Sequence, residues 1–389
     1  MSCISIRHQS NKMRKLLLFV LILSLSLSGC VLAGERADES RHYSDLEITH
    51  SLELRYAEQF FVDYLSDGSA LITIMDSGQF LIVPEGREPP LDVDSGITVL
   101  RRPLENVYLA ATSAMCLFDA LDALPSISMS GTKADGWYIE SAKLAMERGE
   151  IVYAGKYSAP DYEMLMAKNC GLAIESTMIT HAPQVKEKLE DLGIPVMVER
   201  SSYEPHPLGR TEWIKLYGLL TGDEERAAAL FDEQALYLDN LFSDNTGKTV
   251  AFFYISSSGS AVVRKNGDYA VKMIELAGGT YTFSDLGDPD SATGSVNLEM
   301  ERFYADAKDA DIIIYNSSID GEVHSIDELL AKSHLIADFK AVKSGDVWCT
   351  GKNLFQETTE FGLMISELNR IFTEPSDNIT GLSYYYKLR

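Results

Sequence analysis

The sequence predicts an α/β protein of two lobes, each with a mostly parallel central sheet, joined by a long rigid helix and preceded by a small antiparallel addition. Two observations carry this prediction. Short apolar strands alternate with helices of about a dozen residues in two separate series, which is typical of parallel sheets with covered faces. Between the two series lies one stretch with a helical period, Gly209 to Phe242. A length of 389 residues is enough for two lobes of ordinary domain size.

The central stretch breaks at Thr221-Gly222-Asp223 and then resumes as a helix. Thr221 and Glu224 have the spacing of a capping box, and acidic residues fill the first turn, where the helix dipole favours them. Apolar residues then recur near a 3.6 period, at Ala227, Leu230, Phe231, Leu238, Leu241 and Phe242. Roughly 20 helical residues span about 30 Å, the width of a small domain. We therefore expect a strut between the lobes; the alternative is an ordinary surface helix within one large domain.

The chain starts with a leader segment rather than with fold. Met13-Arg14-Lys15 is basic, and Leu16 to Leu27 is apolar but short for a membrane span. Leu27-Ser28-Gly29-Cys30 resembles a bacterial lipobox. On that resemblance the peptide is cut before Cys30 and the Cys30 thiol takes a diacylglycerol. A plain signal peptide or an uncleaved anchor is the alternative, and translation could start at Met13 instead of Met1.

The charge and the cysteines exclude several classes of protein. Removing residues 1–29 deletes four basic residues and no acidic one, which takes the formal net charge from −24 to −28. That much negative charge argues against a nucleic-acid partner and against binding of anionic lipid through the protein surface. Cys116, Cys170 and Cys349 stand alone in the sequence, without the spacing of a disulfide framework or a zinc site. We expect them to be small buried apolar residues.

The chain then divides into six segments: signal peptide 1–29, tether 30–45, N-terminal β addition 46–96, N-terminal lobe 97–208, inter-lobe helix 209–245 and C-terminal lobe 246–389. Alternating runs separated by Asp67-Gly68 and Asp76-Ser77-Gly78 predict hairpins in the addition. The expected strands of the first lobe are Val107–Ala111, Ile127–Met129, Ile151–Tyr153, Leu172–Ile174 and Val196–Val198, and its helices are Ser113–Leu124, Trp137–Arg148, Ser158–Asn169 and Ala182–Leu192. The expected strands of the second lobe are Val250–Ile255, Ile312–Tyr315 and Val347–Cys349, and its helices are Asp268–Leu276, Leu298–Lys308, Ile326–Ser333 and Thr358–Phe372.

Motifs of enzymes are missing from the sequence: it contains no phosphate-binding loop, no dinucleotide fingerprint, no zinc-protease motif and no nucleophile elbow. Ser256-Ser257-Ser258-Gly259-Ser260 follows a strand but lacks the lysine of a phosphate loop, so a flexible cleft loop is the better interpretation. His206 stands between two prolines just before the strut. It could be an axial ligand to haem, a polar contact in the cleft or a structural residue.

The sequence holds 19 tyrosines, and several follow predicted strands directly. Because ligands on parallel sheets gather at the carboxyl ends of the strands, these rings are candidates to line a site for a large, flat or chelated ligand. Packing in the core is the alternative for about half of them.

Several stretches in order resemble the solute-binding lipoproteins of bacterial ABC importers for iron complexes, haem and corrinoids, the group with a rigid inter-lobe helix. They are Tyr108–Ser113, Ala159–Leu165, Cys170–Ile174, Leu276–Gly279, Met300–Phe303, Asp309–Ile314 and Ala341–Trp348. In the family a proline precedes each late strand, whereas this sequence has Asn169-Cys170 and Asp309-Ala310 at those places. The resemblance implies one exposed glutamate per lobe that docks onto the permease dimer, Glu163 and Glu301, with Glu299 as the rival of Glu301.

The resemblance thus implies a lipid-anchored monomer on the extracytoplasmic face of the cell membrane. It would capture a ferric siderophore, haem or a corrinoid in the inter-lobe cleft and deliver it to an ABC permease, with no catalysis and no cofactor beyond the lipid. The candidate ligand-binding residues are Thr112, Ser113, Trp137, Tyr157, Met178, Arg210, Tyr254, Arg264 and Asn316. Two alternatives stay open: a chelatase-like enzyme acting on a tetrapyrrole or metal, for which Cys116 lies nearest a ligand loop, and a surface ligand sensor without a permease.

Overall fold

The computed structural model describes residues 41–241, 245–288 and 294–389 and separates two compact units. One unit comprises, among these residues, Arg41–Leu46 and Pro90–Asp94. It contains the short 3-10 helix η1 (Tyr43–Asp45), and the backbone amide of Tyr43 donates to the carbonyl of Leu91 at 2.7 Å. The other unit comprises Glu47–Pro89 and Ser95–Arg389 and holds the sheets and helices described below. The predicted signal peptide and the lipidated Cys30 lie outside the described residues.

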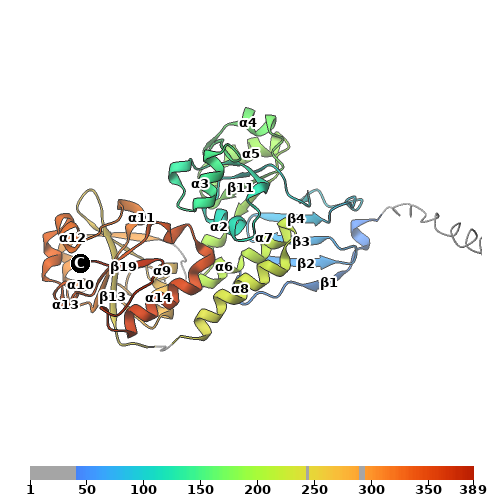
Figure 1. Ribbon diagram of the computed structural model, residues 1–389. Helices are drawn as coiled ribbons and strands as arrows, with labels where there is room; N and C mark the ends of the chain where they lie inside the picture. Colours follow the sequence, from blue (N-terminus) through green and yellow to red (C-terminus); the bar gives the residue numbers. More distant parts are fainter. Residues whose placement is uncertain (1–40, 242–244, 289–293) are drawn as a thin grey trace, which may run out of the picture. The chain divides into compact units, whose positions relative to one another are not determined.

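The N-terminal addition is a five-stranded sheet in the order β1-β2-β3-β4-β5 (Figure 1). Its first four strands pair antiparallel, as the hairpin signals predict, and the last two pair parallel. Ile97–Arg101, which the sequence analysis assigned to the first lobe, is therefore the fifth strand of this sheet. The strands are β1 (Ile48–Ser51), β2 (Phe60–Leu65), β3 (Ala70–Ile74), β4 (Gly78–Val83) and β5 (Ile97–Arg101).

The sheet of the first lobe has the strand order β12-β11-β6-β7-β8, with every neighbouring pair parallel. All five predicted strands form, and the four predicted helices form as shorter elements. Two of these helices begin later than predicted, because the small hairpin of β9 and β10 precedes α4 and the turn η4 precedes α3. The strands are β6 (Val107–Leu109), β7 (Ile127–Ser130), β8 (Val152–Tyr153), β9 (Gly155–Lys156), β10 (Ala159–Pro160), β11 (Leu172–Ser176) and β12 (Val196–Glu199). The helices are η2 (Thr112–Ala114), α2 (Met115–Ala120), η3 (Leu124–Ser126), η4 (Ala134–Gly136), α3 (Glu140–Glu147), α4 (Tyr162–Ala167), η5 (Thr177–His181), α5 (Pro183–Asp191) and η6 (Ser201–Tyr203).

The linking stretch forms three consecutive helices, α6 (Pro207–Glu212), α7 (Ile214–Thr221) and α8 (Glu224–Asp239). Gly222 ends α7 with a φ of 87°, so Thr221 is the last residue of α7 and not the cap of α8. The predicted capping box at Thr221 is therefore wrong: Asp223 caps α8 by accepting from the backbone amide of Arg226 at 3.3 Å. Phe242 lies outside the described residues.

Helix α8 contacts residues of both lobes. Near its start, the Arg226 guanidinium pairs with Asp122, which follows α2 in the first lobe. Farther along, the buried Gln234 accepts from the backbone amide of Leu363, at 3.1 Å, on α14 of the second lobe. Of the predicted apolar face, Ala227 and Phe231 are fully buried, and Leu230 and Leu238 pack against the same core. The helix thus spans from one lobe to the other, as predicted (Figure 1).

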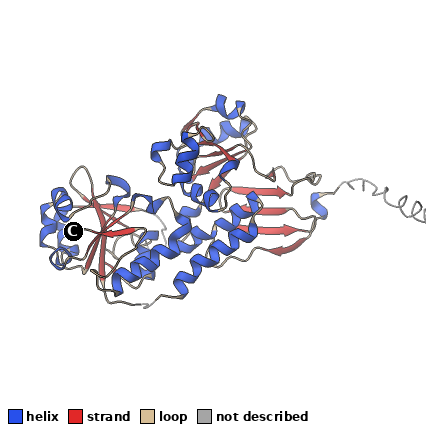
Figure 2. Cartoon of the chain, viewed as in Figure 1, coloured by secondary structure: helices blue, strands red, loops and turns tan. Residues whose placement is uncertain are grey.

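The sheet of the second lobe has the order β16-β14-β13-β17-β18-β19, with β15 paired to β13. Its middle strands are parallel, and β14, β16 and β19, which were not predicted, add antiparallel edges. Helices lie around these strands (Figure 2). The strands are β13 (Thr249–Ile255), β14 (Ala261–Arg264), β15 (Thr280–Tyr281), β16 (Ser295–Leu298), β17 (Ile312–Tyr315), β18 (Val347–Thr350) and β19 (Tyr385–Lys387). The helices are α9 (Tyr269–Leu276), α10 (Met300–Ala307), α11 (Ser317–Asp320), α12 (Ile326–Lys332), η7 (His334–Asp338), α13 (Lys340–Ser344), η8 (Lys352–Phe355), η9 (Thr358–Glu360) and α14 (Phe361–Thr373).

The serine-rich segment Ser256–Ser260 is the turn of a hairpin between β13 and β14. The backbone amide of Ser256 donates to the carbonyl of Ser260 at 2.9 Å, and Gly259 takes a φ of 82°. These internal hydrogen bonds close the segment on itself, so it is a hairpin turn.

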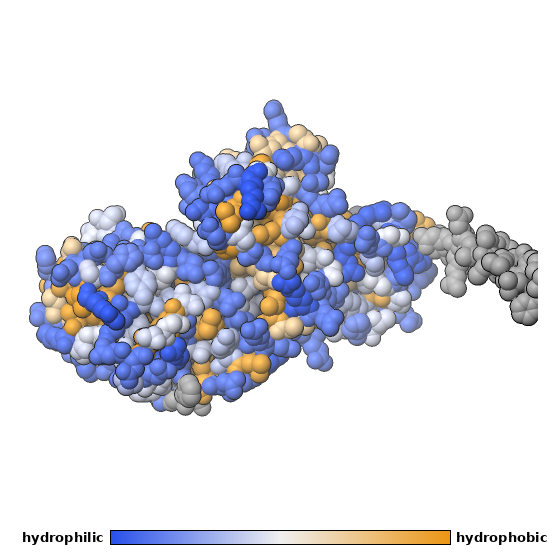
Figure 3. Space-filling model, viewed as in Figure 1, coloured by the Kyte–Doolittle hydropathy of each residue, from blue (hydrophilic) through white to orange (hydrophobic). Residues whose placement is uncertain are grey.

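One apolar core runs from the N-terminal sheet through the linking helices into the second lobe. A second, smaller core lies against the other face of the first-lobe sheet, around Tyr108, Ala173 and Leu189. Hydrophilic side chains predominate on the face shown in Figure 3, as the high net charge predicts.

Candidate functional site

The first-lobe strands all run parallel, so their carboxyl ends meet at one edge of the sheet. Open α/β sheets bind ligands at this edge. The segments that follow these strands contain η2, η4, η5 and η6, and each begins within a few residues of the strand end. We take this edge, together with the parts of the second lobe that contact it, as the candidate ligand site.

Several large side chains are exposed in these segments. Tyr138, Tyr153, Met178 and Tyr203 follow or end four different strands, and their exposed fractions run from 38% for Tyr153 to 46% for Met178 and Tyr203. In the second lobe, Ile319 is exposed in α11, directly after β17. Exposed aromatic and methionine side chains at a strand-end edge provide apolar contact area for a ligand.

Two of the exposed tyrosine rings have a cation above them. The guanidinium carbon of Arg200 lies 4.7 Å from the centre of the Tyr203 ring, and the Lys133 ammonium lies 5.5 Å from that of Tyr153. Such cation–π pairs place positive charge beside an apolar surface. A flat ligand with anionic groups could contact the ring and the cation together.

A buried polar cluster lies beneath these segments. The Glu199 carboxylate, at the end of β12, accepts from the Ser113 hydroxyl at 2.8 Å and from the backbone amide of Ser201 at 2.8 Å. Glu199 is only 1% exposed, and this pairing fixes the start of η2 against η6. Ser113, one of the predicted ligand residues, is thus held in place by a carboxylate.

Arg210, on α6, connects the two lobes. It donates to the carbonyl of Ser202 in the first lobe at 2.7 Å, and its guanidinium lies 4.1 Å from the ring centre of Tyr269 in the second. The Tyr269 ring stacks in turn on Phe361, at 5.3 Å between centres. Burial lowers the pKa of Arg210, while the neighbouring Tyr269, Asp268 and Glu199 act in the opposite direction.

Arg264, at the end of β14, pairs with Asp268 at 3.6 Å. Burial lowers the pKa of Arg264, but the nearby acidic groups, Asp268 first, outweigh burial, so the net pKa is raised. Burial also raises the pKa of Asp268, against the attraction of Arg264. Asp268 and Tyr269 act on the pKa of both predicted arginines, Arg210 and Arg264.

Other predicted residues lie in the core or in local turns. Trp137 is only 2% exposed and packs in the main core, whereas the adjacent Tyr138 is an exposed ring. Tyr157 and Tyr254 are half-buried and pack against the smaller and the main core, respectively. The buried Asn316 caps α11 by accepting from the backbone amide of Ser318 at 3.1 Å.

Thr112 and Met178, by contrast, are exposed, in η2 and η5 at the strand-end edge. Sequence reasoning missed Tyr138, Tyr153 and Tyr203. Their signal was available, because each ends a predicted strand or follows one within nine residues. The sequence could not show which of two adjacent aromatic residues, Trp137 or Tyr138, faces solvent.

His206 and Cys116 both have structural roles. The Nδ1 atom of His206 accepts from the backbone amide of Leu208 at 3.1 Å, and its ring stacks on Tyr56 at 4.3 Å between centres. Burial lowers the pKa of His206 to about 4. Burial likewise raises the pKa of the Cys116 thiol, which contacts the Thr358 hydroxyl at 3.4 Å. A buried protonated thiol is a poor nucleophile and a poor metal ligand.

The predicted docking glutamates occupy matching places in the two lobes. Glu163 is the second residue of α4 and Glu301 the second residue of α10, and both side chains are exposed. Glu299, the rival of Glu301, is exposed at the N-cap of α10 and makes no capping hydrogen bond there.

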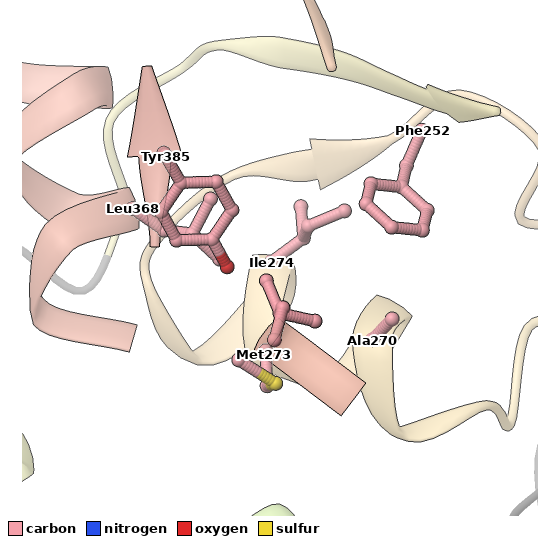
Figure 4. A pocket seen from close by; sticks show the side chains of 7 residues that line it. Phe252, Ala270, Met273, Ile274, Leu368 and Tyr385 are labelled. Atoms are coloured by element: carbon pink, nitrogen blue, oxygen red, sulfur yellow. The ribbon is translucent and has the colours of Figure 1, made fainter. Parts of the chain in front are cut away.

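The second lobe contains a small pocket of about 10 Å³ lined by residues of β13, α9 and α14, among others (Figure 4). Its lining is apolar apart from the Tyr385 hydroxyl, and its volume is about that needed by one water molecule. Two larger surface depressions, of about 440 and 300 Å³, contain none of the predicted ligand residues. None of these three spaces is the site predicted from the sequence.

Among residues 41–241, 245–288 and 294–389, no group of three or more His, Cys, Asp or Glu side chains is arranged to hold a metal ion. Within the same ranges, no helix combines the length and the apolar character needed to cross a membrane.

The chain belongs to the periplasmic binding protein family, whose family model matches residues 112–354. Two similar relatives are uncharacterized lipoproteins of Methanocaldococcus jannaschii. One is 27% identical over 66% of this chain and 62% of its own length, so the match spans less than two thirds of that relative. The other is 24% identical over 97% of this chain and 100% of its own length.

Solved structures share the fold. The catecholate-siderophore binding protein VctP of Vibrio cholerae has a TM-score of 0.56 at 12% identity, over 69% of this chain and 94% of its own. The haem-binding protein HutB of Vibrio cholerae has a TM-score of 0.53 at 17% identity, over 68% of this chain and 98% of its own. Both are periplasmic binding proteins of two-lobed α/β fold, so the fold class predicted from the sequence is confirmed.

Proposed function

We propose that this protein is the lipid-anchored solute-binding component of an ABC importer, and that it captures a chelated metal complex between its lobes. The ligand class is a ferric siderophore, haem or a corrinoid. The observation that carries the proposal is the edge of exposed Tyr138, Tyr153, Met178 and Tyr203, with Arg200 and Lys133 over two of the rings. Names of similar proteins support the same class, since two of them bind a catecholate siderophore and haem.

Each part of the edge has a physical role in this function. The rings would cover the flat or apolar face of the complex, and the cations would pair with its carboxylate or catecholate oxygens. Arg210 and Arg264 would add a buried positive field below the ligand, which attracts an anionic complex into the site. In the part of the chain that the structure describes, nothing provides a thiolate or a metal cluster for chemistry, and the proposed role requires none.

A thermal-shift panel tests ligand binding. Lipid-free protein is heated with haem, cobalamin and several ferric siderophores, and a ligand at about 100 times its Kd should add roughly 2.7 kcal/mol of stability. Tyr203→Ala should reduce the shift, whereas Leu236→Ala, which removes an exposed apolar side chain on α8, should leave it unchanged. The proposal fails if no compound in the panel shifts the melting temperature.

Delivery to a permease is tested separately at the glutamates. We expect Glu163 and Glu301 to pair with arginines of a permease dimer, because two separated acids on one body set both contact and orientation. The double variant Glu163→Gln and Glu301→Gln should bind ligand normally but lose transfer to a reconstituted permease. Glu187→Gln, on the exposed side of α5, is the matched control and should transfer normally. Unimpaired transfer by the double variant would contradict the docking role.

A further inference from the structure

The segment Arg55–Gln59, between β1 and β2, has no regular secondary structure, yet its amides are all paired. The amides of Arg55, Tyr56 and Ala57 donate to the Glu212 carboxylate at 2.8–3.0 Å. Those of the next two residues, Glu58 and Gln59, donate to the Glu204 carboxylate at 2.7 and 3.0 Å. Five successive backbone donors between β1 and β2 therefore end on two side chains, one just before α6 and the other on its last residue.

Both carboxylates are fully buried and have a further partner. Glu212 accepts from the Lys215 ammonium at 2.7 Å, and Glu204 accepts from the indole Nε1 of Trp213 at 2.7 Å. Buried charges persist when they are hydrogen-bonded in this way, and the removal of one partner is costly. The contacts therefore bind the segment tightly to α6.

The backbones also approach closely. A Cβ atom on Gly209 would lie 2.9 Å from the backbone oxygen of Tyr56 and 3.2 Å from the Glu204 carboxylate. Only glycine leaves room for this approach. The Tyr56 ring stacks on His206, the N-cap of α6, so the segment covers α6 from its first turn to its last residue.

The opposite side of α6 contacts both lobes. Arg210 bonds the Ser202 carbonyl of the first lobe and stacks on Tyr269 of the second. The hydroxyl of the next residue, Thr211, donates to the Thr358 carbonyl of the second lobe at 2.7 Å. Three consecutive residues, Arg210 to Glu212, thus join the two lobes and the N-terminal segment.

We propose that the N-terminal sheet is a brace for the junction of the lobes, and that Glu204 and Glu212 are the positioning residues through which it acts. The five amides hold the carboxylates, the carboxylates hold α6, and α6 holds Arg210 and Thr211 against the second lobe. The family model begins only at residue 112, so the N-terminal sheet precedes the matched region, whereas Glu204 and Glu212 lie within it. This inference rests on the proposed function only in one respect, which is that Arg210 was proposed to lie below the ligand.

Hydrogen exchange followed by mass spectrometry tests the brace without any ligand. In the double variant Glu204→Gln and Glu212→Gln, we expect the amides of residues 55–59 to exchange about tenfold faster or more. The same should hold for residues 356–361 at the junction, whereas β17 (Ile312–Tyr315) in the second-lobe core should exchange as before. The matched control is Glu225→Gln, an exposed acid in the first turn of α8, which should change none of these segments.

Two results would overturn the proposal: acceleration confined to residues 55–59, which makes the contact merely local, or equal acceleration everywhere including β17, which is global destabilisation. If circular dichroism shows that the double variant does not fold, Gly209→Ala gives the same reading with both carboxylates kept, because its methyl displaces the segment. The two proposals can fail separately. If hydrogen exchange changes as expected but the protein binds no metal complex, the proposed function is contradicted and the brace is not.

Discussion

Glu175 offers the sharpest test of the structure, because it is a carboxyl group buried without a hydrogen-bond partner on either oxygen. It lies in β11, is 0% exposed, and faces the smaller core beside Val198 of β12. The titratable groups within electrostatic reach, Tyr108, Tyr162 and Cys170, bring no positive charge. Burial raises the pKa of Glu175 to about 8.

The sign of the pH dependence follows from this shift. The folded-state pKa of about 8 lies above the ordinary value of 4.5, so the neutral form is favoured on folding. The contribution to stability is fully present below pH 4.5 and is lost as the pH rises through 8. At 1.36 kcal/mol per pH unit, the loss across this interval is roughly 5 kcal/mol.

Glu175→Gln replaces the titrating group by a neutral one of the same shape, and denaturant unfolding at pH 5, 7 and 9 measures the effect. We expect the variant to match the parent near pH 5 and to be more stable by several kcal/mol at pH 9. Glu163→Gln, an exposed acid of the same lobe, should show no such trend. A stability difference that stays constant from pH 5 to 9 would refute the assigned environment of Glu175.

Three further predictions concern other buried positions. Burial lowers the pKa of His206 to about 4, so its contribution to stability is present above pH 6.5 and is lost as the pH falls through 4. His206→Asn keeps a capping side chain but does not titrate, so the acid-induced loss in free energy of unfolding should be smaller by about 2 kcal/mol in denaturant titrations. Trp137→Phe should cost about 2 kcal/mol less in free energy of unfolding than Trp213→Phe, because the Trp137 indole N–H has no partner while that of Trp213 donates to Glu204. Gly362→Ala would place a methyl 2.1 Å from the Gln234 carbonyl oxygen and should cost about 3 kcal/mol or more, whereas Gly96→Ala, with no atom within 4 Å, should be nearly neutral in thermal melts.

The strand and helix pattern was readable from the sequence where apolar periodicity was strong. Buried runs such as Ile312–Tyr315 have no interpretation other than a covered strand or a buried helix, and their length decides. The edge strand β16 was missed because its pairing with β14 is non-local. Strand β14 was missed because Ser256–Ser260 was interpreted as a cleft loop and not as a hairpin turn. Thr221 was misassigned as a cap because the sequence alone could not tell that Gly222 ends one helix before the next begins.

The candidate site was predictable only in part, since type and position along the chain do not fix which way a side chain points. Arg210 and Arg264 were chosen for a charge that could hold carboxylate or catecholate oxygens, and their role in ligand binding stays a prediction. Trp137 and Tyr138 show what the sequence could not determine. They are adjacent aromatic residues, but the larger ring, Trp137, is buried in the core and Tyr138 is exposed. The brace left no sequence signal, because Glu204 and Glu212 resemble any other pair among 58 acidic residues.

The contacts around the linking helices bear on how the lobes could move when a ligand binds. Gly209, Gly218 and Gly362 each bring backbone or Cβ atoms of neighbouring segments close enough that an added methyl would clash. Segments packed this closely cannot slide past one another without a steric clash. A rotation of the lobes would also have to break the buried hydrogen bonds of Glu204, Glu212 and Thr211. Because each of those groups would then be buried without its partner, a large hinge motion is energetically unfavourable. Ligand capture should therefore depend on side-chain rearrangement of the exposed residues at the strand-end edge, such as Tyr203 and Met178, which are each 46% exposed.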